Sequence, residues 1–292
     1  MQYKITVGIP SCKRPDLLER ALKSFVKKNL KNLYVIISID GIDSSFGEYK
    51  KIESNYKKYN FIRFYYHKKN IGSLKNFLFL KDISTTKYFM WLADDDESNT
   101  DMIYKLFEIL ENNNDVVTAV PYWELAFANG NRKIIKPSSF SDNNVFLRIL
   151  KYVYYSDDAF FYGLHKLEFL NKCSFKKYWW PNTKYLSNWC YVFQFDLIIQ
   201  GKIFLLKDKE MRWINHDYGP KHYPRTAAFS KIKRELLFLI RKVNIYYFYL
   251  AKLIKWRKYS YAFILFFIFF ILYFRDIIKN TLTPLVKKYI SF

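Results

Sequence analysis

Short apolar runs alternate with amphipathic segments along the first 121 residues, and this alternation constrains the fold more than any other feature of the sequence. The apolar runs occupy residues 4–10, 33–39, 61–66, 88–93 and 116–121. Helical patterns follow the first, third and fourth runs, over 14–27, through Leu80 and over 100–111. Parallel strands that are covered on both faces give unbroken apolar runs, and they need helical crossovers. The sequence therefore predicts an α/β fold with a mainly parallel sheet flanked by helices.

Acidic residues directly follow two of these apolar runs. Asp40 follows the second run, and Asp94, Asp95 and Asp96 follow the fourth. Ligands of open α/β sheets bind beyond the carboxyl ends of the strands, and three adjacent carboxylates repel one another unless a cation or donors offset their charge. In an extended segment Asp94 and Asp96 point to the same side. The pattern predicts a site for Mg²⁺ or Mn²⁺ at Asp94 and Asp96; the alternative is a solvated acidic turn before the helix at Thr100.

The net charge and the cysteines limit the classes of partner. A formal charge of +22 favours nucleic acid, an anionic membrane leaflet or phosphorylated substrates. The aromatic residues are concentrated in apolar runs, and zinc-finger and RNP spacings are absent from the sequence, so we expect no nucleic-acid partner. Three widely spaced cysteines indicate neither a disulfide framework nor a metal quartet, and they fit a reducing cytosol. Residues 1–10 show no pattern of an export signal.

The composition changes near residue 230. Residues 231–258 contain nine basic residues and one acidic residue, which predicts one or two basic amphipathic helices. Residues 260–274 carry no charge, and as a helix they would extend about 22 Å against a hydrocarbon core of about 30 Å. We expect residues 230–292 to form a peripheral or monotopic anchor at an anionic membrane surface, on the cytoplasmic face of the inner or plasma membrane. The alternative is a buried core helix.

Four segments of the first 120 residues resemble family 2 glycosyltransferases of the GT-A fold. These segments are VGIPSCKRPDLLERAL (7–22), ISIDG (37–41), NIGSLKN (70–76) and WLADDDE (91–97). The resemblance implies that the donor, a nucleotide-sugar, contacts Pro10, Asp40, Asn70, Lys75 and Asp94. It also implies that Asp94 and Asp96 bind Mn²⁺ or Mg²⁺, and it divides a domain 1–229 into a donor half (1–121) and an acceptor half (122–229).

The resemblance is weaker beyond residue 121. Residues 160–170, which include His165 as a packing or surface residue, resemble the strand and turn that enter the acceptor half. Many inverting members then place an acidic pair before a helix, where this chain has Ser187 and Asn188. An amide cannot accept a proton at neutral pH, so the base is sought elsewhere. The candidates, in order of preference, are Asp158, Asp157 and Asp196.

Residues 212–225 are expected to form a loop that contains glycine and proline. This loop carries His216 and His222. The resemblance implies a histidine contact to the metal or the diphosphate here, and His216 is preferred over His222. The alternative is a histidine exposed on a surface loop.

The resemblance implies inverting transfer of a sugar from a nucleotide-sugar to a glycan or lipid-linked glycan acceptor. Such a reaction would serve the assembly of cell-surface polysaccharide, lipopolysaccharide or glycoprotein glycans. A nucleotidyltransferase is one alternative, although residues 10–12 lack the glycines of its phosphate loop. A second is a membrane-bound adaptor that binds a nucleotide-sugar without turnover, because the acidic pair is missing.

Overall fold

The chain divides into two compact units in the computed structural model. The structure describes residues 3–26, 32–127, 129–155, 159–175, 189–209, 212–217, 243 and 245–277. Unit 1 consists of residues 1–143, 159–172 and 200–217, and unit 2 of residues 144–158, 173–199 and 218–292. The divisions after residues 121 and 229, which rest on sequence pattern and resemblance, stay predictions.

A seven-stranded sheet forms the centre of unit 1, in the order β10-β6-β9-β4-β1-β2-β3. Its strands are β1 (Ile5–Ser11), β2 (Leu33–Ile39), β3 (Ile62–Tyr66), β4 (Tyr88–Trp91), β6 (Val116–Val120), β9 (Leu164–Lys166) and β10 (Lys202–Leu205). Among these described strands only β9 runs antiparallel to its neighbours, β4 and β6. The prediction of a mainly parallel sheet is confirmed, and each of the five apolar runs contains a strand.

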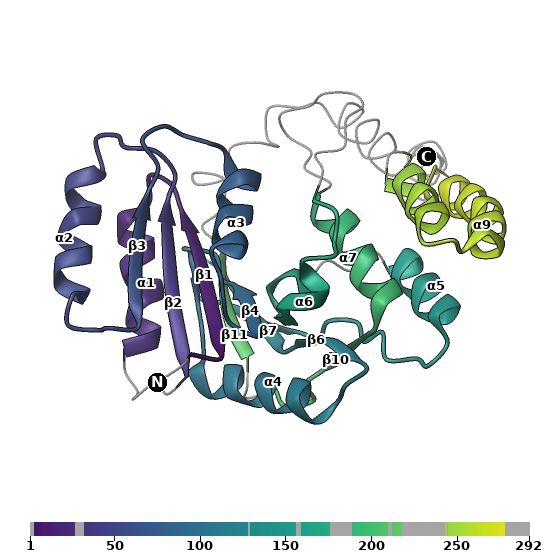
Figure 1. Cartoon of the computed structure of the whole chain (residues 1–292), viewed down its shortest axis with the longest axis horizontal. Coiled ribbons are helices and arrows are strands. Elements are labelled where there is room, and N and C mark those ends of the chain that lie inside the picture. The colour runs from purple at the N-terminus through teal and green to yellow at the C-terminus, as the bar shows by residue number, and fades with distance from the viewer. Residues whose placement is uncertain are drawn as a thin grey trace, which may run out of the picture. The chain divides into compact units, whose positions relative to one another are not determined.

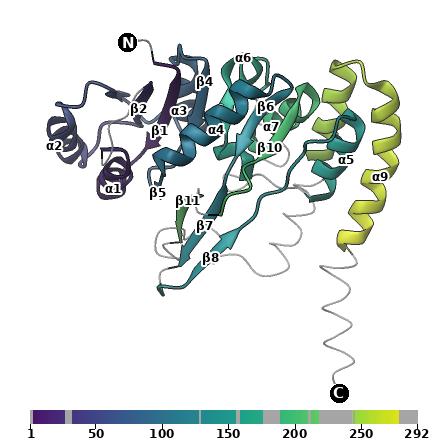
Figure 2. The ribbon, with the colours of Figure 1, turned by 90° about the horizontal axis from the view of Figure 1, so that it is seen from below.

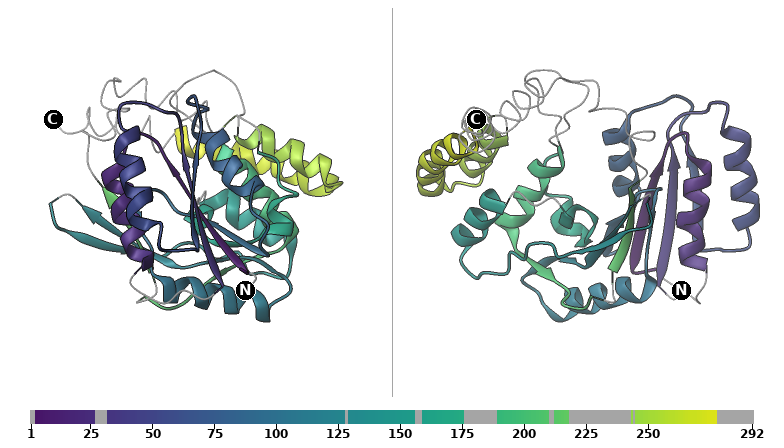
Figure 3. Two further views of the ribbon diagram at one scale, coloured as in Figure 1. Left: turned by 60° about the vertical axis from the view of Figure 1, so that its left-hand side comes forward. Right: turned by 180° about the vertical axis from the view of Figure 1, so that it is seen from behind.

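Helices cover both faces of this sheet. They are α1 (Pro15–Val26), α2 (Phe46–Tyr56), α3 (Ser73–Asp82) and α4 (Thr100–Asn112), and two short elements, η1 (Ala159–Tyr162) and α6 (Leu167–Leu170), flank β9. Ile5, Val7 and Ile9 share one apolar core with residues of α1, α2 and α4. On the other face α3 approaches β1 so closely that a Cβ at Gly8 would lie 3.1 Å from the Cβ of Leu80. Figures 1 and 3 show α1 and α2 on one side of the strands and α3 on the other.

A second, four-stranded sheet has the order β5-β11-β7-β8. Its strands are β5 (Asp96–Glu97), β7 (Tyr122–Phe127), β8 (Arg132–Ile135) and β11 (Arg212–Asp217), and Figure 2 shows β11, β7 and β8 side by side. Gly130 has a φ of +87° between the antiparallel strands β7 and β8, a backbone conformation that glycine adopts readily in a tight turn. The expectation of a loop over 212–225 is wrong for residues 212–217, because they pair with β7 on one side and β5 on the other.

His165 of β9 is a fully buried packing residue. Its Nε2 lies 3.1 Å from the carbonyl oxygen of Phe161, and its Nδ1 lies 2.9 Å from Oγ1 of Thr118. A carbonyl oxygen only accepts, so Nε2 carries the proton and Nδ1 accepts from the threonine hydroxyl. Burial lowers the pKa of His165 to about 4, which keeps the ring neutral.

The buried His165 is expected to make the protein less stable as the pH falls from about 6.5 to about 4. The ring takes up a proton near its ordinary pKa in the unfolded chain but only near pH 4 in the folded chain, so acid favours the unfolded state. The loss between about pH 7.5 and about pH 5 amounts to about 2 kcal/mol. Urea unfolding of the wild type and His165→Gln at these two pH values measures it. Equal pH dependence in the two proteins would contradict a neutral, buried ring.

Unit 2 is helical in its described part. It contains α5 (Val145–Tyr155), α7 (Trp189–Gln200), a helical segment over 245–255 and α9 (Tyr259–Ile277). No helix in the described ranges is both long enough and apolar enough to cross a membrane.

Candidate functional site

The carboxyl ends of β1, β2 and β4 bring together the strand-end acids that the sequence singles out. These three parallel strands are neighbours, with β1 in the middle. The hydroxyl of Ser11, the last residue of β1, donates to Oδ2 of Asp94 at 2.6 Å. The backbone N–H of Asp40 donates to the carbonyl oxygen of Ser11 at 2.8 Å. Asp40 and Asp94 are therefore joined through one residue, although they are 54 positions apart in the sequence.

Asp40 holds the loop that precedes α3. Its Oδ1 accepts the N–H of Ile71 at 2.6 Å, and its Oδ2 accepts the N–H of Gly72 at 3.1 Å. The side-chain amide of Asn70 donates back to the carbonyl oxygen of Asp40 at 3.3 Å. The structure thus brings together Asp40 and Asn70, which the sequence assigned to one donor site. Their contact with a donor stays a prediction.

Gly41 is expected to tolerate no side chain, because the loop of Asn70 lies against it. Its φ is +93°, and a Cβ there would lie 2.9 Å from the backbone nitrogen of Asn70. Gly41→Ala should lower the free energy of unfolding by about 1–3 kcal/mol, whereas Gly47→Ala, in α2 with open space around it, should be neutral or stabilising. Urea unfolding of the two variants provides the comparison. A Gly41→Ala protein as stable as Gly47→Ala would show that this loop is not packed as described.

Arg14 supplies the positive charge that the crowded acids require. Its Nη2 lies 2.5 Å from Oδ1 of Asp94, and its Nη1 lies 2.9 Å from Oδ2 of Asp95. Asp94 and Asp95 lie in a turn, so the expected extended alternation, with Asp95 directed away from Asp94, is wrong: both carboxylates contact the same guanidinium. Arg14 lies in the segment 7–22, and the sequence predicted no role for it. The requirement for a cation beside adjacent carboxylates was the signal that could have identified it.

The pKa of Asp94 is strongly shifted by its burial. Burial raises the pKa of Asp94 to about 7, against the opposing effects of the Arg14 guanidinium and the Ser11 hydroxyl. Tyr49 extends the network, because its hydroxyl lies 2.8 Å from Oγ of Ser11 and accepts the N–H of Arg14 at 2.9 Å. Since Ser11 donates to Asp94, Tyr49 donates to Ser11. Burial also raises the pKa of Tyr49 to about 12, so its hydroxyl keeps its proton.

Asp96 and His216 occupy neighbouring positions of the second sheet. Asp96 is fully buried in β5, and its backbone pairs with Asn215 of β11. His216 follows Asn215 in that strand and pairs with Ala126 of β7. The backbone therefore brings together the segments of two of the three predicted metal residues. Within the described residues no three His, Cys, Asp or Glu side chains are grouped so as to hold a metal ion, and the metal roles stay predictions.

The other residues predicted to contact the nucleotide-sugar differ in their exposure to solvent. Pro10 is buried in β1, where it pairs with Ser38 of β2. Lys75 is exposed on α3. Asn76, next to it, is buried and bonded to Ser38 through its side chain, with Ser38 Oγ donating to Asn76 Oδ1 at 2.5 Å. The buried amide fixes the start of α3 on β2, which leaves Lys75 facing solvent.

Of the three candidates for the base, the structure describes Asp196. Asp157 and Asp158 lie outside the described residues. Asp196 belongs to α7 of unit 2, where it is buried and paired with Lys252. It also accepts the backbone N–H of Ser174 at 2.8 Å and the indole N–H of Trp256 at 3.1 Å. A proton-accepting role for any of the three stays a prediction.

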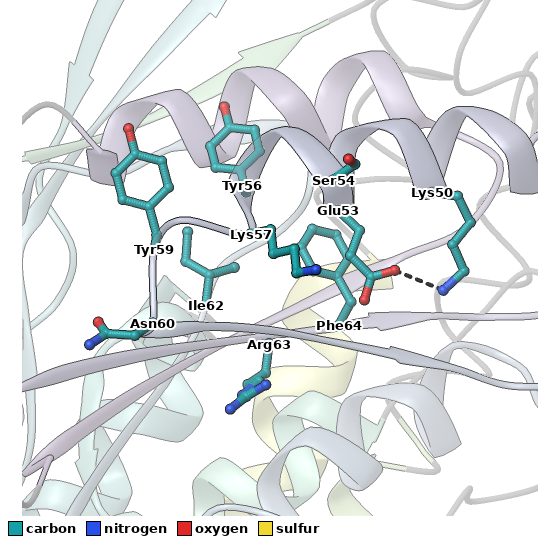
Figure 4. Close-up of a pocket in the computed structure, with 10 residues that line it drawn as sticks. All are labelled: Lys50, Glu53, Ser54, Tyr56, Lys57, Tyr59, Asn60, Ile62, Arg63 and Phe64. Carbon is teal, nitrogen blue, oxygen red and sulfur yellow. Dashed lines mark hydrogen bonds and ion pairs between the residues drawn. The ribbon is translucent and has the colours of Figure 1, made fainter.

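A cavity of about 640 Å³ opens between α2 and the edge strand β3 (Figure 4). Lys57 and Arg63 contribute to its lining, together with Glu53, which forms an ion pair with Lys50 at 2.7 Å. Its strand residues, 62–64, belong to the amino-terminal half of β3. None of the described donor or metal residues predicted from the sequence lines it. The cavity is therefore separate from the strand-end cluster.

The region of the chain that carries this cluster matches a known protein family. The model of glycosyl transferase family 2 matches residues 6–168, more than half of the chain. No curated protein sequence matches significantly. The matched region contains β2, β4, the acids of the cluster up to Asp96, and β1 from Thr6 onward.

Several solved structures share the fold. TarS of S. aureus, residues 1–349, is 13% identical with a TM-score of 0.56, and its complex with UDP-GlcNAc gives a TM-score of 0.59; each comparison covers 82% of this chain and 66% of that one. The mannosyltransferase PcManGT of Pyrobaculum calidifontis, in complex with GDP-Man and Mn²⁺, is 10% identical with a TM-score of 0.53, covering 83% of this chain and 64% of that one. This chain thus spans slightly less than two thirds of these relatives. At such identities the likeness shows the fold, which is the predicted GT-A fold.

Proposed function

The chain belongs to glycosyl transferase family 2, and we propose that it transfers a sugar from a nucleotide-sugar donor to a glycan or lipid-linked glycan acceptor. One observation carries this proposal: Asp40, Asp94 and Asp96 are buried at the strand ends of the region that the family model matches. Open α/β sheets bind their ligands at that edge. Two structural relatives are complexes with UDP-GlcNAc and GDP-Man, which supports a nucleoside diphosphate sugar as the class of donor.

The donor would bind between the loop that follows β2, which carries Asp40, and the loop of residues 70–72, which Asp40 holds. Asp40 fixes residues 70–72 with two hydrogen bonds, so the loop is held in one position before the donor arrives. Lys75, exposed one turn into α3, would supply a positive charge for the diphosphate. Asp94, held by Ser11 and Arg14, would keep the end of β4 in place beside the ribose.

A divalent cation fits this site as a partner of the donor and not as an ion enclosed by protein. Mg²⁺ is commonly held by one or two carboxylates together with substrate phosphates. This agrees with the described residues, among which no three His, Cys, Asp or Glu side chains are grouped so as to hold a metal ion. Asp96 is the first ligand that we propose, with His216 from the neighbouring strand. Asp94 would have to leave Ser11 or Arg14 to bind a cation. When bound, the cation would neutralise charge on the departing diphosphate.

We propose an inverting single displacement. A base removes the proton of the acceptor hydroxyl as its oxygen attacks the anomeric carbon, and the nucleoside diphosphate leaves from the opposite side. Asp158 and Asp157 come first as candidates for the base. Asp196 comes last because its carboxylate already carries an ion pair with Lys252 and two further hydrogen bonds; it would have to lose the lysine before it could accept a proton.

The class of donor can be tested with a panel of nucleotide-sugars. One of them, at about 100 times its dissociation constant and with Mn²⁺ present, should stabilise the fold by about 2.7 kcal/mol, which corresponds to a rise in Tm of roughly 5–10 °C. The same compound should be turned over, with release of the nucleoside diphosphate. Nucleoside monophosphates serve as the control. Stabilisation without turnover by any acceptor would favour the adaptor, and the absence of both effects for every nucleotide-sugar would refute the proposal.

A further inference from the structure

The helix α9 exposes a continuous apolar face. Each residue of this face is between 47% and 69% exposed to solvent: Phe263, Phe266, Phe267, Phe270, Ile271 and Phe274. At 100° per residue these positions cover about 140° of the helix circumference. An exposed apolar surface of this kind marks a site of interaction.

The opposite face of α9 is buried against the rest of unit 2. Leu265 and Phe269 are buried, and the ring of Phe269 stacks on Tyr246 with centroids 4.3 Å apart. The helix is therefore apolar on both faces, but the described residues of unit 2 cover only one of them. A helix that is apolar all round normally lies in a protein core or in lipid.

Contacts with neighbouring helices fix the direction of the exposed face. Phe146, at the start of α5, packs on Tyr261 with ring centroids 5.0 Å apart, and Arg275 lies 5.4 Å from the ring of Tyr154 near the end of α5. These two contacts show that the helices run in the same direction, and Figure 2 shows them side by side. The segment 245–255 is joined to α7 by the ion pair of Lys252 with Asp196. The face is thus a fixed surface of unit 2.

Basic residues stand at both ends of this face. Lys255 and Arg257 are exposed just before α9 begins, and Arg275 is exposed near its end. Tyr259 and Tyr273 are the tyrosines closest to the two ends of the helix. Lysine and arginine beside an apolar surface interact favourably with anionic headgroups, and tyrosine is enriched at the boundary between headgroups and hydrocarbon.

We propose that this face of α9 inserts among the headgroups and upper acyl chains of an anionic lipid bilayer, with the helix axis parallel to the membrane. The helix cannot be surrounded by lipid, because the side of Leu265 and Phe269 is covered by protein. A second copy of the chain is the less suitable occupant. Helix pairs pack along a narrow seam, whereas this face is broad. The basic residues at its two ends would also repel those of a second copy. The inference does not depend on the transfer reaction proposed above.

Flotation of the full chain with lipid vesicles tests the proposal. The wild type should float with vesicles that contain phosphatidylglycerol and bind much more weakly to phosphatidylcholine alone. Phe266→Ser/Phe267→Ser/Phe270→Ser should reduce partitioning into the phosphatidylglycerol vesicles by about 100-fold or more. A matched control is Ile42→Ser/Ile134→Ser, which alters two apolar residues of unit 1 that are 49% and 44% exposed and should leave partitioning unchanged.

Two outcomes would overturn the proposal. One is equal flotation of the wild type and the triple serine variant, with circular dichroism showing that both are folded. The other is a wild type that does not bind the vesicles but forms a dimer, while the triple variant stays monomeric. That result would make the face an interface between copies. Lys255→Ser/Arg257→Ser gives a separate check, because it should weaken binding to the anionic vesicles and leave the weak binding to phosphatidylcholine unchanged.

Discussion

Asp96→Asn is expected to abolish sugar transfer and to preserve the fold. Asparagine has nearly the shape of aspartate, and the backbone pairing of Asp96 with Asn215 does not involve the side chain. The exchange removes the negative charge that we propose binds the cation. The loss in turnover should be at least ~100-fold, the upper range for residues that merely support a metal ligand. Turnover is measured as release of nucleoside diphosphate over a series of Mn²⁺ concentrations.

The control for this experiment is Asp101→Asn, which makes the same chemical change in the first turn of α4. Its turnover and Mn²⁺ requirement should match those of the wild type. Near-normal transfer by Asp96→Asn would remove Asp96 from the metal site. If the variant lost activity but bound the nucleotide-sugar as well as the wild type at every Mn²⁺ concentration, Asp96 would act in the reaction and not as a ligand.

Lys252→Met is expected to destabilise unit 2 by about 3–5 kcal/mol, because it leaves a carboxylate buried without its cation. Asp196 is 1% exposed, and two other described donors to it, the Ser174 N–H and the Trp256 indole, carry no charge. The same exchange at Lys255, an exposed lysine on the same helical segment, should change stability by no more than about 0.5 kcal/mol. Urea unfolding of the two variants measures the difference. Equal stability would show that the pair is not buried as described.

The double variant Lys252→Met/Asp196→Leu separates a structural role of Asp196 from a catalytic one. Apolar residues in place of both charges should restore most of the lost stability. If Asp196 only joins the C-terminal helices to α7, the double variant should also transfer sugar. If it is the base, the double variant should be stable and inactive. A destabilised double variant would contradict the account of the pair itself.

Local pattern was sufficient for the central sheet of unit 1. Each apolar run of the first 121 residues forms a strand close to the predicted bounds, and residues 33–39 form β2 without a shift. The helices α1 and α4 also lie where their periodicity places them. These elements are set by side chains near one another in the chain, since burial on one or both faces dictates the spacing of apolar residues. The second sheet was missed because β11 pairs with strands about 90 and 118 positions earlier in the chain. The spacing of apolar residues within 212–217 does not indicate that pairing.

The sequence by itself determined which residues meet at the strand ends, because parallel neighbouring strands must finish at a common edge. Asp40 and Asp94 are joined there through Ser11, and Asn70 lies on the loop that Asp40 holds. Only the tertiary structure decided what neutralises these acids and where Asp196 belongs. Arg14 reaches both Asp94 and Asp95 across 80 positions, and Lys252 reaches Asp196 across 56. Charges buried together must find partners in space, and a partner can come from any part of the chain that the fold brings within contact distance.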